Sequence, residues 1–461
     1  MMSTTAQRHH WFVLLLIAAS RYLVMADLTI ADLIGVDLQR SFEATPAELL
    51  LARNAMPISL TMAIPLAVLI ANRIGLGRSV QISLACLGGG LLLAANASTI
   101  ATFAIGRMLQ GFATAVVSSQ TFALIQIYLP QAWLNRGVAL ITATGAVGLA
   151  TGPLLASWST AAGHWRWVFM ALAAAVMLLM LLACALLKRP LEPVAQPAQH
   201  GLSLVAGSGF CVALALALTR WPMGMSLDKD WLRSLELLAV ALLGVFLLMR
   251  WRCSQGTWRQ PMFQLAFVVR LLLFGVVAAP NFFVVLFLRT ELSWSVEQAA
   301  LLCVAYSAAL LLGIPLSTRL SKRVSLSQLI RIGFFLMALS FVGWILALAQ
   351  TSAMAMAVSN SLLGFAMGLQ IPAVTAAGMR AAPPGYAVSA SAWLILADSL
   401  GPMLGLACQG GLLVAIDPLL ERQRFIVGLQ GIYLSSTVVL VMAALVCGHW
   451  PRSARIRAIS P

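Results

Sequence analysis

The chain has 461 residues, of which 61% are apolar and only 9% are charged. Soluble domains carry about 25% charged residues, so this composition excludes an ordinary soluble protein. The net charge of +15 would suit a nucleic-acid partner. However, if the N-terminus is placed in the cytoplasm, the excess of Lys and Arg falls in cytoplasmic segments, as in membrane proteins. We therefore expect a multi-pass protein of a bacterial inner (plasma) membrane, with both termini cytoplasmic and no nucleic-acid partner.

Fourteen apolar stretches are long enough to be transmembrane helices, since a helix needs about 20 residues to cross a membrane. Helices are expected because lipid offers the backbone no hydrogen-bond partners. The predicted spans form a first group at 11–33, 47–70, 80–97, 101–124, 137–159 and 167–187. A middle pair lies at 202–221 and 231–249, and a last group at 267–288, 297–317, 326–348, 352–375, 387–414 and 425–448.

Short motifs recur in the two outer groups at a nearly constant offset of about 250 residues. The recurring motifs are Ile-Pro-Leu at 64–66 and 314–316, Gly-Phe-Ala at 111–113 and 364–366, and Gly-Pro at 152–153 and 401–402. Two parallel six-helix halves with a substrate site near the midplane are a recurring transporter plan. We therefore predict an N-terminal six-helix half (1–187), linkers with two inserted helices (188–260), and a C-terminal six-helix half (261–461).

Charged residues inside predicted spans are the first candidates for function, since each costs at least about 2.5–3.5 kcal/mol to insert. Asp27 and Asp32 are candidates for taking up and releasing protons, since burial raises the pKa of a carboxyl group. Arg107 is a candidate for adjusting that pKa, because a nearby cation lowers it. A purely structural ion pair with Arg107 is the alternative. Asp27 and Asp32 lie about 140° apart around an ideal helix, so they do not face one neighbour together.

Other polar residues in the spans are candidates for the substrate cavity. Asp398 is either a second proton-coupling residue, a partner for Arg21, or a cap on a helix broken at a proline. Arg21 itself either extends to the cytoplasmic surface or lines the cavity and favours anionic substrates. Gln110, Asn281 and Gln370 are expected beside the cavity.

Four motifs in the first half resemble one known family. Residues 26–32 resemble the pattern Leu-Asp-x-Thr-Ile-Val-Asn, with Asp32 in place of the Asn. Residues 107–111 match Arg-x-x-Gln-Gly, and residues 148–153 fit the antiporter motif Gly-x-x-x-Gly-Pro. Residues 164–169, His-Trp-Arg-Trp-Val-Phe, are similar to Trp-Arg-Trp-Ile-Phe. Together they resemble the fourteen-helix drug:proton antiporter branch of the major facilitator superfamily, which implies an all-α membrane protein with the major facilitator fold.

The resemblance also implies gating motifs. The antiporter motif supplies Gly148, Gly152 and Pro153. The loop after the second predicted helix resembles Ala-Asp-Arg-x-Gly-Arg-Arg and supplies Asn72, Arg73, Gly75 and Arg78. Asn72 replaces the family's acid, which in the family helps a charge network to hold the outward-facing state.

The function implied by the resemblance is proton-coupled antiport that exports lipophilic, often cationic, small molecules by alternating access, as in multidrug efflux. One alternative is an exporter of a single metabolite, anionic if Arg21 lines the cavity. Another is a transporter-like sensor that does not transport. No nucleotide-binding or hydrolase motif is visible, so we expect no enzyme and no cofactor. The seven Cys residues are scattered and predict neither a disulfide framework nor a metal site. The expected partners are a small-molecule substrate, protons and membrane lipid, with the chain a monomer.

Overall fold

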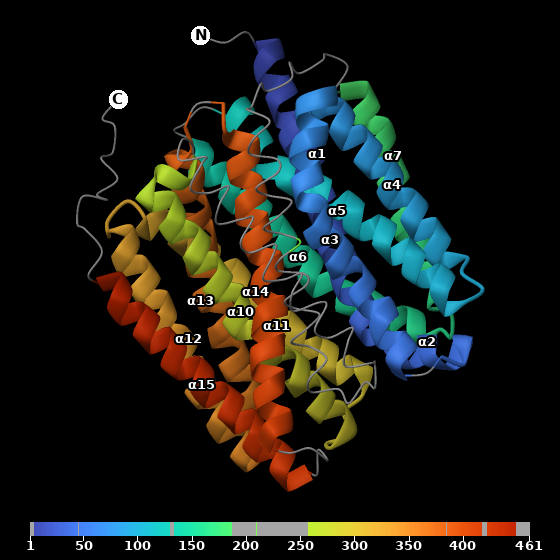
Figure 1. The fold of residues 1–461 in the computed structure, drawn as a ribbon, viewed down its shortest axis with the longest axis vertical. Coiled ribbons are helices and arrows are strands. Elements are labelled where there is room, and N and C mark those ends of the chain that lie inside the picture. The colour runs from blue at the N-terminus through green and yellow to red at the C-terminus, as the bar shows by residue number, and fades with distance from the viewer. Residues whose placement is uncertain are drawn as a thin grey trace.

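The structure is a computed structural model that describes residues 4–44, 46–129, 133–186, 257–383, 385–416 and 422–448, together with Gly209. Every regular element in these residues is a helix. Figure 1 shows long helices in two groups that lie side by side, one coloured blue to green and the other yellow to red. Ten helices of the described part are long and apolar enough to cross a membrane, or eleven if the bent helix α3 is one span.

The first group holds one helix for each of the six predicted spans, and one more. Its elements are α1 (Thr4–Leu33), α2 (Gly35–Phe42), α3 (Pro46–Ile74), α4 (Leu76–Ala95), α5 (Ile100–Tyr128), α6 (Leu134–Ala161) and α7 (Arg166–Leu186). The short helix α2 was not predicted, because eight residues, half of them with polar side chains, carry no transmembrane signal. The bend of 53° in α3 separates Ala55–Ile64 from Leu66–Ile74. It falls at Pro65, which removes a backbone donor.

The second group begins with a short 3₁₀ helix and contains six long helices where six spans were predicted. Its elements are η2 (Thr257–Arg259), α10 (Pro261–Thr290), α11 (Val296–Leu320), α12 (Leu326–Gln350), α13 (Ala353–Ala381), α14 (Ala387–Ile416) and α15 (Arg422–Gly448). The middle pair predicted at 202–221 and 231–249 lies outside the described residues.

The two groups pack their helices in the same way. Helix α3 packs on α5, and α11 packs on α13. A Cβ on Gly111 would collide with the carbonyl oxygen of Met56, and a Cβ on Gly364 would collide with that of Tyr306. Small residues allow such close backbone approach between membrane helices. The repeated Gly-Phe-Ala motif therefore makes the same contact in both groups.

The antiporter motif lies where α6 packs directly on α1. A Cβ on Gly148 would meet the carbonyl oxygen of Tyr22, and a Cβ on Gly152 would lie 2.5 Å from that of Ala26. In the second group Gly401 of α14 approaches α10 in the same manner. Pro153 is buried inside α6. These glycines set the distance between the first and fifth spans of the predicted halves.

Aromatic rings explain the motif at residues 164–169. Trp165 and Phe169 form edge contacts with Phe103 of α5, and Trp165 also contacts Phe42 at the end of α2. The guanidinium of Arg166 lies 4.4 Å from the ring centre of Trp165. The motif therefore ties α2 to α5 and α7.

The most extensive contacts between the two groups are made by four helix pairs: α3 with α14, α5 with α14, α6 with α11, and α6 with α13. Near the C-terminal ends of α5 and α13, Gln126 Nε2 donates a hydrogen bond of 3.2 Å to the carbonyl oxygen of Met379. These ends lie on the same side of the bundle as the loop at Gly75, because the helices alternate in direction. That side is the one predicted to be cytoplasmic.

Candidate transport site

A buried ion pair joins α1 to α5. Arg107 Nη1 lies 2.9 Å from Asp27 Oδ1, and both side chains are 2% exposed. Arg107 Nη1 also donates to Gln110 Oε1 at 2.7 Å, and Nη2 lies 2.8 Å from Met56 Sδ. Residues three apart on a helix share a face. The motif Arg-x-x-Gln therefore places an acceptor beside the guanidinium and orients it toward Asp27.

The hydrogen bonding of this pair is incomplete. Asp27 Oδ2 and Arg107 Nε are both buried, and neither has a hydrogen-bond partner among the described residues. An unpaired polar atom in a low-dielectric interior is costly. A carboxylate that uses one oxygen for an arginine and leaves the other unpaired is well suited to accept a proton there. Asp27 and Arg107, both singled out from the sequence, are thus brought into direct contact.

A second buried ion pair lies within the other group, between α10 and α14. Arg270 Nε donates to Asp398 Oδ1 at 2.7 Å, and Nη2 pairs with Oδ2, so the interaction is bidentate. Arg270 Nη1 donates to the hydroxyl of Thr375 on α13. The guanidinium carbon also lies 5.8 Å from the ring centre of Phe122 on α5. Arg270 therefore touches the first group while its charge is neutralised within the second.

Arg270 is not among the candidates that the sequence suggested. It lies only three residues inside the predicted span 267–288, close to the end of the predicted linkers at 188–260. The repeat offers the signal that finds it, because the offset that relates the two Gly-Pro motifs also relates Arg21 to Arg270. Asp398 pairs with Arg270, and not with Arg21 as one of its three expected roles had it.

Arg21 of α1 packs against α5 and α6. Its Nη1 donates to Ser118 Oγ on α5 at 3.2 Å, and a Cβ on Gly145 of α6 would lie 3.5 Å from its Nε. Ser118 lies about one helical turn before Phe122 on α5, and Phe122 is the residue that the guanidinium of Arg270 approaches. The side chain of Arg21 is half-buried. Arg21 thus lies against α5 and α6, two helices that contact the second group, and its role as a cavity residue stays a prediction.

The remaining polar candidates are dispersed. Gln110 is buried beside Arg107, as described above. Gln370 is also buried, but its Nε2 lies 3.4 Å from Met337 Sδ, so it packs between α13 and α12. Asn281 is exposed on α10, and the structure does not bring it to either ion pair. Asp32 is part of α1, but its side chain lies outside the described ones.

The loop between α3 and α4 is a tight turn. Gly75 has φ 82° and ψ 158°, a region that favours glycine. Arg73 and Arg78 are exposed. The Oδ1 atom of Asn72 is buried and has no hydrogen-bond partner among the described residues. The amide therefore occupies the position of the family's acid without contributing its negative charge.

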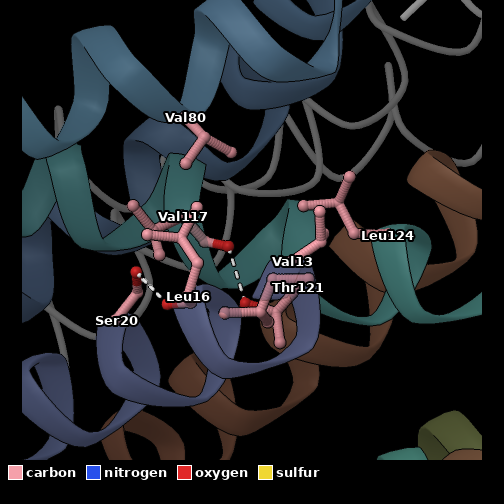
Figure 2. Close-up of a pocket in the computed structure, with 8 residues that line it drawn as sticks. Val13, Leu16, Ser20, Val80, Val117, Thr121 and Leu124 are labelled. Atoms are coloured by element: carbon pink, nitrogen blue, oxygen red, sulfur yellow. Dashed lines mark hydrogen bonds between the residues drawn. The ribbon is translucent and has the colours of Figure 1, made fainter. Parts of the chain in front are cut away.

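A small apolar pocket lies between α1, α4 and α5 (Figure 2). Its two hydroxyls are already used within their own helices, as Ser20 donates to the Leu16 carbonyl and Thr121 donates to the Val117 carbonyl, both at 2.8 Å. Val13, Val80 and Leu124 add only apolar surface. The pocket is a packing gap and offers no polar group that would orient a ligand.

Comparison with known proteins identifies the family. The model of the Major Facilitator Superfamily matches residues 11–406, and again residues 265–460. The chain belongs to the Major Facilitator Superfamily. This major facilitator is 25% identical over 442 residues to the uncharacterized transporter YebQ of Escherichia coli (strain K12), covering 95% of this chain and 94% of YebQ. It is 27% identical over 415 residues to the methyl viologen resistance protein SmvA of Salmonella typhimurium (strain LT2), covering 87% and 82% of the two chains.

Solved structures share the major facilitator fold. The proton:xylose symporter XylE matches with a TM-score of 0.66 and 15% identity, covering 95% of this chain and 96% of XylE. The human organic anion transporter MFSD10 matches with a TM-score of 0.66 and 14% identity, covering 95% and 99%. At this identity the likeness shows the fold alone. Membership of the Major Facilitator Superfamily makes this chain a multi-pass membrane transporter and not an enzyme.

Proposed function

We propose that this major facilitator is a proton-coupled antiporter that exports lipophilic small molecules across a bacterial inner membrane by alternating access, with both termini in the cytoplasm and a monomer as the working unit. The observation that carries the proposal is the buried pair of Asp27 and Arg107, which leaves one carboxylate oxygen unpaired. The relatives named for methyl viologen resistance and for multidrug resistance support an export role.

The packing offers a route from protonation to helix movement. With Asp27 ionised, its charge holds α5 against α1 through Arg107. Protonation removes this attraction and alters the preferred distance between the two helices. Helix α1 is in close contact with α6 through Gly148 and Gly152, and α6 contacts α11 and α13. A proton on Asp27 therefore biases the interface between the two groups, and a ligand shifts such an equilibrium by its differential affinity for the two states.

The charge of the exported molecule is a separate question. The drug:proton antiporter resemblance predicts molecules that are often cationic. The alternative of one anionic metabolite is favoured by a specific observation, the position of Arg21 against α5 and α6. The sensor alternative is disfavoured by the Asp27–Arg107 pair, because buried pairs are poor stability devices and a protein without transport has little use for one.

The test is proton-driven uptake into everted membrane vesicles that contain the full chain. A lipophilic cationic dye and a lipophilic anionic dye are compared in wild type, Asp27→Asn and Glu43→Gln. Glu43 is exposed beyond α2, so this control removes a carboxylate outside the site. We expect wild type and the Glu43 variant to accumulate at least one dye, and Asp27→Asn to lose proton-driven accumulation. Accumulation by Asp27→Asn at the wild-type rate would reject Asp27 as the coupling residue.

A further inference from the structure

Arg21 and Arg270 are equivalent residues of the internal repeat. Arg21 lies on α1 and Arg270 on α10, the first long helix of each group. Each donates to a hydroxyl of the equivalent partner helix: Arg21 to Ser118 on α5, and Arg270 to Thr375 on α13. Ser118 and Phe122, the α5 residues next to the two guanidinium groups, lie about one helical turn apart on the same face of α5. The repeat thus brings two arginines to the same face of α5.

Only one of these arginines is neutralised by direct contact. Asp398 binds Arg270 through both carboxylate oxygens and makes no direct contact with Arg21 in the described part of the chain. The direct polar partner of Arg21 in the described part of the chain is the neutral hydroxyl of Ser118. Two arginines and one aspartate leave this cluster with one excess positive charge. An uncompensated cation inside a membrane is costly, so the cluster favours a further anionic group.

Exposure distinguishes the two arginines as ligand-binding groups. The side chain of Arg270 is 1% exposed and its donors are committed to Asp398 and Thr375. Arg21 is half-buried, and a guanidinium has five donors, of which the structure uses one for Ser118. The remaining donors can form the bidentate contact that guanidinium groups make with carboxylates.

We propose that Arg21 binds the anionic group of the transported molecule, and that this group is a carboxylate on a lipophilic body. The proposal rests on the proposed transport function and specifies its substrate class. Ser118 orients Arg21, and Arg270, paired with Asp398, approaches the same face of α5 at Phe122. The carboxylate of Asp398 repels the bound anion and so limits its affinity. Arg21 and Asp398 therefore have opposite effects on the same ligand.

The experiment measures equilibrium binding to the purified full chain in lipid nanodiscs, with three probes of similar size: 4-phenylbutyrate, its neutral amide and 4-phenylbutylamine. We expect wild type to bind the carboxylate most tightly. Arg21→Gln should weaken carboxylate binding by about tenfold or more, the size of a lost charged hydrogen bond, with little change for the amide. Asp398→Asn should strengthen carboxylate binding, and Arg21→Lys should retain part of it.

Arg40→Gln is the matched control, since it removes an exposed arginine of α2 and should change none of the three affinities. The proposal is overturned if wild type prefers the amine or binds none of the probes. An equal loss for all three probes in Arg21→Gln, or weaker carboxylate binding in Asp398→Asn, would also overturn it. Binding requires no proton gradient, and we expect Asp27→Asn to keep the preference for the carboxylate. Failure of the vesicle test and failure of this test are therefore distinguishable.

Discussion

At the scale of single residues, the energetics of Asp27 and Arg107 are those of a buried pair in contact at 2.9 Å. Removing one partner leaves the other charge buried and unpaired, whereas removing both does not. We predict that Asp27→Asn and Arg107→Gln each lower the free energy of unfolding. The double variant should be more stable than the sum of the two losses implies, by about 1–3 kcal/mol. Thermal and denaturant unfolding of the detergent-purified chain measure this cycle.

The control cycle combines Asp27→Asn with Asp398→Asn, whose direct ion-pair partners lie in separate helix groups. Losses of unfolding free energy at two sites with no shared partner are additive to within about 0.5 kcal/mol. Additive losses for Asp27 and Arg107 themselves would mean that the contact between them contributes nothing, and that another group compensates each charge.

Only some of the residues that form the site could be predicted from the sequence. Asp27, Arg107 and Gln110 were predicted because they fall in motifs, and motifs preserve contacts within one half. Arg270 lies outside any such motif and close to a predicted helix end, where an arginine normally marks the cytoplasmic surface. Its partner Asp398 is 128 residues away. A sequence gives the position of each charge along its own helix, but not which charges meet across two helices.

At the scale of helices, glycine contacts control how closely α1 and α6 approach. A Cβ on Gly152 would lie 2.5 Å from the carbonyl oxygen of Ala26 and would collide with the hydroxyl of Thr29. We predict that Gly152→Ala forces the helices apart and destabilises the chain by about 1–3 kcal/mol, the usual cost of overpacking. It should also reduce transport. Gly89→Ala is the matched control, because no atom lies within 4 Å of its Cβ position.

Thermal unfolding and vesicle uptake of both variants test the expected effects on stability and transport. Equal behaviour of the two alanine variants would show that the contact between α1 and α6 is not close in the working protein.

The existence of the long helices was predictable because an apolar run of spanning length has few other solutions in lipid. Helix α2 was not predictable in this way, since it is held by the contacts of Phe42 with Phe103 and Trp165 rather than by its own composition.

At the scale of the whole molecule, alternating access requires the contacts between the two groups to open and close. The contact between Gln126 and Met379 joins the ends of α5 and α13. We predict that a cross-link between Gln126→Cys and Met379→Cys, made in a background with the seven native Cys replaced, stops transport until it is reduced. Uptake in vesicles before and after a bifunctional thiol reagent measures the effect.

The matched control is a cross-link inside the first group, between Ser59→Cys and Met108→Cys. In the native chain Ser59 donates to the Met108 carbonyl at 2.7 Å. This link joins α3 to α5, which move together in a rocking mechanism, so transport should survive it. Transport that survives the link between Gln126 and Met379 would rule out separation of these ends during the cycle.

The most direct test of the account is the direction of proton movement during transport by the purified chain. Liposomes contain the protein and an internal pH dye. The molecule found in the vesicle assay is added outside them, so that its concentration is higher outside than in the lumen. Antiport through Asp27 predicts that the lumen becomes alkaline as the molecule enters, and that Asp27→Asn shows no pH change. Entry of the molecule with no proton movement, or with acidification of the lumen, would contradict the account.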